Sequence, residues 1–156
     1  MAKEYSSAPE VRDIAERLIE ILKPELEGFE IQYVFCSEKL MHGGREVSGL
    51  ARKVVGLNAF LAGHSEGFFV LETSKLAWDL MTENQRIAYV HHELCHFGIS
   101  DEGSLTIIPH DIEEFNHVAE VHGEYHPGLV IFGAALRKGE NSGTREEIKQ
   151  RILNGE

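Results

Sequence analysis

The pentapeptide His92-Glu93-Leu94-Cys95-His96 is the motif that most clearly predicts a local structure in this sequence, namely a helix that can bind a metal ion. On an α-helix, residues four apart lie on the same face, so the imidazoles of His92 and His96 can bind one metal ion. Glu93 is turned about 100° around the helix axis from His92. It is therefore poorly placed as a third ligand, but it can reach a water molecule at the metal. Two ligands and a base on one helical turn are the pattern of zinc metallopeptidases.

The residues around the pentapeptide predict the helix that it requires. Thr82 and Gln85 match a capping box, in which two side chains satisfy backbone N–H groups at the start of a helix. Gly98 is a typical residue to terminate one. Between them, apolar residues recur at helical spacing and should face the core: Ile87, Val90, Leu94 and Phe97. The sequence thus predicts one amphipathic helix with both histidines inside it.

A catalytic zinc site needs a third protein ligand and one open coordination position. A second helix is predicted over residues 109–122, because Pro109 suits a first helical position and Gly123 suits the stop. His110 would lie in its first turn, near a loop that can fold back on the motif helix. Spacing alone does not choose among the side chains of suitable chemistry, which are His110, Glu113, Glu114, His117 and His122.

The remaining patterns predict an α+β fold. Apolar residues at helical spacing predict a first helix over residues 9–26. Alternating residues predict strands over 28–35 and 50–58, and a short apolar run predicts another over 68–72. We expect a small mixed or antiparallel sheet packed against the N-terminal helix and a metal-binding pair of helices. We expect residues 1–140 to form one domain and residues 141–156 to form a peripheral C-terminal helix or tail.

Composition narrows the partners and the compartment. The chain has 156 residues, with 42% hydrophobic and 26% charged, as in an ordinary globular protein. A formal net charge of -11 argues against nucleic acid as a partner. The longest mainly apolar run, residues 128–136, is too short to span a membrane. Only two cysteines are present, Cys36 and Cys95, so we expect reduced thiols and a cytoplasmic location.

The pentapeptide and the later block His110-Asp111-Ile112-Glu113-Glu114-Phe115 together resemble the putative phage metallopeptidase family. That family pairs a His-Glu-Leu-x-His helix with a downstream His-Asp-x-x-x-Phe block, in a style similar to the SprT-like minimal zincins. The resemblance covers residues 29–126, and Tyr125 stands where the family would have tryptophan. It implies a minimal zincin-like domain with His92, His96 and His110 as Zn²⁺ ligands. It also implies Glu93 as the catalytic base.

The function implied by the resemblance is zinc-dependent hydrolysis of peptide bonds by an activated water, with Glu93 as general base. The partner would then be a peptide or protein substrate. Zincins commonly align substrate along an edge strand, and we predict that residues 68–72 form it. The alternative is a zinc-binding, non-catalytic module, or a nucleoprotein-associated interaction module of phage type. In a non-catalytic module, Glu93→Gln would change nothing in any assay.

Overall fold

The computed structural model describes residues 2–155. They form two compact units, the first ending at Ile108 and the second beginning at Pro109. The chain is α+β, as predicted: the first unit combines helices with small sheets, and the described residues of the second unit contain helices without strands. Within residues 2–155, none of the helices has both the length and the apolar character that a bilayer span requires.

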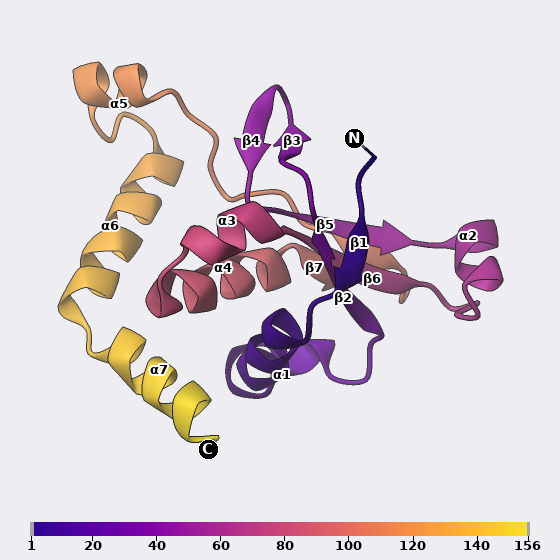
Figure 1. Cartoon of the computed structure of the whole chain (residues 1–156). Coiled ribbons are helices and arrows are strands. Elements are labelled where there is room, and N and C mark those ends of the chain that lie inside the picture. Colours follow the sequence, from indigo (N-terminus) through magenta and orange to yellow (C-terminus); the bar gives the residue numbers. More distant parts are fainter. Residues whose placement is uncertain (1, 156) are drawn as a thin grey trace. The chain divides into compact units, whose positions relative to one another are not determined.

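A four-stranded mixed sheet forms the centre of the first unit, in the order β1-β2-β6-β5 (Figure 1). Strands β2 (Ile31–Cys36) and β6 (Phe68–Ser74) are parallel, whereas β1 (Tyr5–Ser7) and β5 (Gly49–Val54) run antiparallel to their neighbours. The predicted edge strand, residues 68–72, is therefore central, and that prediction is wrong. Its nearly continuous run of buried side chains fits a strand paired on both sides.

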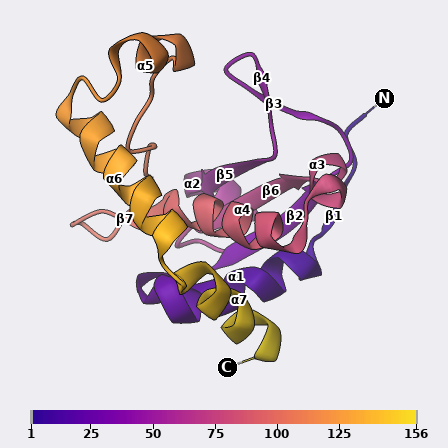
Figure 2. The ribbon, with the colours of Figure 1, turned by 90° about the vertical axis from the view of Figure 1, so that its left-hand side faces the viewer.

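Helices α1 (Pro9–Leu22) and α4 (Glu83–Cys95) lie side by side on one face of this sheet (Figures 1 and 2). The alternate side chains of β6 that point to this face pack against α4 and the residues after it. Phe69 stacks on Phe97 with ring centroids 4.5 Å apart. The core between helices and sheet is fully buried and includes Val11, Leu18, Leu71, Val90 and Leu94. Burial of this apolar face drives α1 and α4 onto the sheet.

A proline and a glycine end one helix and one strand earlier than the sequence predicted. The first helix was expected to run to residue 26, but α1 ends at Leu22 and Pro24 begins a 3₁₀ turn, η1 (Pro24–Leu26). A proline cannot continue the hydrogen-bond ladder of a helix. The strand expected to reach residue 58 ends at Val54, because Gly56 takes a positive φ of 63° and starts α2 (Gly56–Leu61).

Two hairpins and one short helix complete the first unit. Strands β3 (Leu40–His42) and β4 (Arg45–Val47) form a hairpin over two glycines with positive φ. Helix α3 (Lys75–Leu80) precedes α4 and buries Trp78, which is 1% exposed. Strands β7 (Phe97–Ile99) and β8 (Leu105–Ile107) form a second hairpin directly after α4.

The second unit contains α5 (Asn116–His122), α6 (Pro127–Asn141) and α7 (Thr144–Asn154). Gly123 ends α5 with a φ of 62°, as predicted. The predicted start at Pro109 is wrong, because residues 109–115 are not helical. The Glu114 carboxylate accepts hydrogen bonds from the backbone N–H of Phe115 and the hydroxyl of Tyr125. Phe115 is extended, and these bonds hold the segment out of the helix.

Candidate metal site

Both hydrogen bonds of the predicted capping box are present at the start of α4. The Thr82 hydroxyl accepts from the Gln85 N–H at 3.3 Å, and the Gln85 side-chain oxygen accepts from the Thr82 N–H at 2.9 Å. Val90 and Leu94 are fully buried, which fixes the rotation of the helix about its own axis. His92, two residues after Val90, is exposed on a different face. The capping box and the core stripe therefore direct the motif face away from the core.

The end of α4 differs from the prediction. The helix stops at Cys95, with His96 as its C-cap, and Gly98 belongs to β7 instead of terminating the helix. Gly98 is small because of packing: a Cβ there would lie 2.6 Å from Cδ1 of Ile108. Absence of this side chain lets the residues that follow β8 pass close beside β7.

Two hydrogen bonds join His96 to Ile108. The Nδ1–H of His96 donates to the Ile108 carbonyl oxygen at 2.6 Å, and the Ile108 N–H donates to the His96 carbonyl oxygen at 2.7 Å. A carbonyl oxygen can only accept, so Nδ1 of His96 carries a proton, and in the neutral imidazole Nε2 is the nitrogen with the lone pair. This bond is of the kind that orients metal-ligating histidines, and it makes Nε2 the available ligand atom.

His110 follows two residues after this anchor. Two residues span at most about 7 Å, so the anchored backbone keeps His110 near His96. One potential ligand atom from each of His92, His96 and His110 lies within 4.8 Å of the other two. Tetrahedral zinc with Zn–N distances of 2.0–2.1 Å places its ligand nitrogens about 3.3 Å apart, so the widest pair of ligand atoms would need to approach by about 1.5 Å at most. The three histidines could hold a metal ion.

The other downstream candidates do not join this group. Among residues 2–155, the cluster that could hold a metal ion contains none of Glu113, Glu114, His117 or His122. The hydroxyl of Tyr125 and the N–H of Phe115 stabilise the Glu114 carboxylate and hold its pKa below the usual value. Glu114 thus has a local role in shaping the segment before α5.

Glu93 lies on the same helical turn as the two histidines but is only 6% exposed. Burial raises the pKa of its carboxyl to about 7, and the charge of His96 opposes this rise. A carboxyl with a pKa near neutrality can both accept and release a proton under ordinary conditions.

Tyr89 is a positioning feature that the sequence reading missed. Its hydroxyl lies 2.8 Å from the Thr73 hydroxyl on β6, which ties α4 to the centre of the sheet. A Cβ on Gly49 of β5 would lie 1.9 Å from that hydroxyl, so the close approach of α4 to β5 depends on glycine. A glycine at the start of a strand can indicate such a close approach. The sequence alone does not indicate that Tyr89 is the residue that approaches Gly49.

Comparison with known families agrees with the site. The family model described as putative phage metallopeptidase matches residues 3–138, a range that includes all three histidines and Glu93. No curated protein and no solved structure matches the chain.

Proposed function

Because the chain belongs to the putative phage metallopeptidase family, we propose that it is a zinc-dependent peptidase. His92, His96 and His110 hold the zinc ion in this proposal, and Glu93 is the general base. The substrate is a peptide or protein chain.

The convergence of the three histidines is the observation that carries the proposal. Their ligand atoms lie within 4.8 Å of one another. Structural zinc sites use four protein ligands, whereas catalytic sites use three and leave one position open. Within residues 2–155, no fourth His, Cys, Asp or Glu belongs to this cluster. The donor set therefore favours a catalytic site over a structural one.

In the proposed reaction, the zinc ion and the side chains of the protein have separate roles. When bound, zinc supplies an activated water and polarises the scissile carbonyl. Glu93 accepts the proton of the attacking water and later delivers it to the amine nitrogen as the peptide C–N bond breaks. The Ile108 carbonyl oxygen accepts a hydrogen bond from Nδ1–H of His96, which keeps the proton on Nδ1 and leaves Nε2 as the nitrogen whose lone pair binds the metal. Each step uses a group whose position or protonation is set by its neighbours.

Strand β5 is the structural candidate for aligning the substrate. It is an edge strand, and it packs against α4 where Tyr89 meets Gly49. Its outer backbone N–H and carbonyl groups can pair with an extended peptide, so that binding relies on main-chain hydrogen bonds. We propose β5 in place of the central strand β6 for this role.

Zinc reconstitution tests the proposal. The purified chain is stripped with a chelator, reloaded with zinc, and incubated with a peptide library whose new termini are read by mass spectrometry. We expect one zinc ion per chain and cleavage that depends on zinc. Stoichiometric zinc without cleavage would instead support the non-catalytic zinc-binding module.

A further inference from the structure

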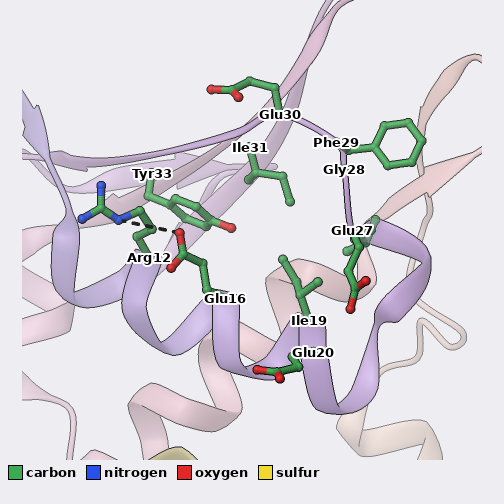
Figure 3. A pocket seen from close by; sticks show the side chains of 11 residues that line it. Arg12, Glu16, Ile19, Glu20, Glu27, Gly28, Phe29, Glu30, Ile31 and Tyr33 are labelled. Atoms are coloured by element: carbon green, nitrogen blue, oxygen red, sulfur yellow. Dashed lines mark ion pairs between the residues drawn. The ribbon is translucent and has the colours of Figure 1, made fainter. Parts of the chain in front are cut away.

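A groove of about 480 Å³ lies between α1 and the segment that enters β2 (Figure 3). Its volume is within the range of roughly 300–1,000 Å³ that is typical of ligand clefts. We call it the α1–β2 groove and define it by Glu16, Ile19, Glu20, Glu27, Ile31 and Tyr33. All of these residues belong to the first unit, and none is part of the histidine cluster.

The floor of the groove is apolar. Ile19 is buried, and Ile31 points from the opposite side toward it (Figure 3). Leu26, which also lines the groove, is fully buried below the surface. The ring of Tyr33 extends this surface, and burial together with the charge of Glu16 raises the pKa of its hydroxyl. The hydroxyl therefore stays protonated, so this end of the floor can form a hydrogen bond.

The rim of the groove is acidic. Glu16, Glu20 and Glu27 carry negative charge around Ile19, and all three are exposed. Among the described residues that line the groove, Arg12 is the single cation, and its ion pair with Glu16 is long, at 4.0 Å. Lys23 lies between Glu20 and Glu27 in sequence, but its ammonium pairs with Glu25 at 2.7 Å, outside the groove. Glu30 also lines the groove and is exposed, so four carboxylates lie around one cation.

We propose that the α1–β2 groove binds a lysine- or arginine-bearing segment of a partner polypeptide. Lysine and arginine side chains lay their aliphatic stems on apolar surfaces and keep their charged ends in polar surroundings. The floor fits the stems, and the rim carboxylates fit the charged ends. A small apolar ligand would leave the rim unpaired, and a compact inorganic cation would leave the floor bare. Binding here is independent of zinc and of peptide hydrolysis.

The matched experiment uses two triple variants of the full chain. One removes the rim charges, with Glu16→Gln, Glu20→Gln and Glu27→Gln. The other removes the same number of exposed carboxylates outside the groove, with Glu4→Gln, Glu10→Gln and Glu102→Gln. The probe is a short end-blocked peptide rich in lysine and leucine, titrated by calorimetry at physiological ionic strength. Its control peptide has glutamine in place of each lysine. Thermal unfolding checks that both triple variants fold.

We expect the rim variant to weaken binding of the lysine peptide about tenfold, and the outer variant to change it less than about twofold. The glutamine peptide should bind none of the three proteins, which are the wild type, the rim variant and the outer variant. Equal weakening in both variants would show only nonspecific attraction to a chain of net charge -11 and would overturn the groove as the site. Absence of lysine-peptide binding to the wild type would also overturn it. Spermidine binding as tightly as the peptide would overturn a polypeptide as the occupant.

Discussion

His96 and Ile108 are joined by a pair of hydrogen bonds, from the Nδ1–H of His96 to the Ile108 carbonyl and from the Ile108 N–H to the His96 carbonyl. The first bond sets the tautomer of one candidate ligand. The second fixes the backbone that leads, two residues later, to His110. This pair of hydrogen bonds therefore positions two members of the histidine cluster. Gly98 has no side chain, which leaves space for the side chain of Ile108.

Gly98→Ala should damage this contact. The new Cβ would lie 2.6 Å from Cδ1 of Ile108, so Ile108 must move. Because Ile108 is 42% exposed and its side chain can shift, we expect a loss of up to about 1 kcal/mol in the free energy of unfolding and zinc binding weakened about tenfold. Urea unfolding and a competitive zinc titration measure the two effects.

A control and a rescue separate this clash from a general effect of alanine. A Cβ at Gly139, inside α6, meets nothing within 4 Å, so Gly139→Ala should stabilise the chain slightly. Ile108→Ala removes the atoms that collide, and the double variant Gly98→Ala with Ile108→Ala should recover most of the loss. Simple addition of the two single effects would exclude the clash as the cause.

His110→Ala tests the third ligand. Removal of one of three histidines should weaken zinc binding by more than about 100-fold, because even loss of a group that only orients a ligand costs about 10–100-fold. His117→Ala is the matched control, since this exposed histidine on α5 also has suitable chemistry but lies outside the cluster. Metal content after dialysis measures both. Full zinc occupancy in His110→Ala would mean that the third ligand lies elsewhere.

The buried Glu93 carboxyl predicts a pH dependence of stability in the metal-free protein. Its pKa in the folded chain is about 7, above the ordinary value, so the folded state binds the proton more tightly than the unfolded state. The stabilisation is fully present below the ordinary glutamate pKa of about 4.3 and is lost as pH rises through 7. We expect Glu93→Gln to remove roughly 1–3 kcal/mol of this stability change between pH 5 and pH 8.

Urea unfolding of the chelator-treated protein at both pH values measures this difference. Glu83→Gln is the control, because Glu83 lies in the same helix but is exposed. An unchanged pH dependence in Glu93→Gln would contradict the raised pKa.

The pair of Arg52 and Glu72 gives a prediction on the opposite face of the sheet. The Glu72 side chain is 5% exposed, and its Oε2 accepts from Arg52 Nε at 2.8 Å. Arg52→Leu would leave this carboxylate buried without its cation, at a cost of about 1–3 kcal/mol in the free energy of unfolding. The double variant Arg52→Leu with Glu72→Leu should recover much of it. Thermal or urea unfolding measures these changes. If the effects of Arg52→Leu and Glu72→Leu on the free energy of unfolding simply add in the double variant, the two side chains do not stabilise each other.

The sequence was informative where local chemistry determines structure. The capping box at Thr82 and the apolar stripe through Val90 and Leu94 predicted α4, and both formed as expected. Spacing could place His92 and His96 on one turn, but it left the third ligand open. The family resemblance singled out His110, which the structure brings to the other two histidines. The assignment of ligand and base roles, and the domain boundary at residue 140, stay predictions.

The sequence was uninformative where long-range contacts decide. Residues 109–115 read as the start of a helix, yet the bonds from Ile108 to His96 and from Tyr125 to Glu114 hold this segment extended or irregular. The run 68–72 read as an edge strand, because strand order cannot be read from alternation. Gly98 was predicted to terminate the helix. Its actual role, to leave space for Ile108, depends on a residue ten positions away, and local sequence does not reveal that contact.

Hydrolysis by Glu93→Gln, compared with wild type at equal zinc occupancy, tests the central claim most directly. The substrate is a peptide that the zinc-loaded wild type cleaves, and metal content is measured on the same samples. We predict that the variant keeps one zinc ion per chain and cleaves about 10²–10⁴-fold more slowly, because only proton transfer is removed. Equal cleavage rates, or loss of zinc in the variant, would contradict the assignment of Glu93 as the base of a zinc peptidase.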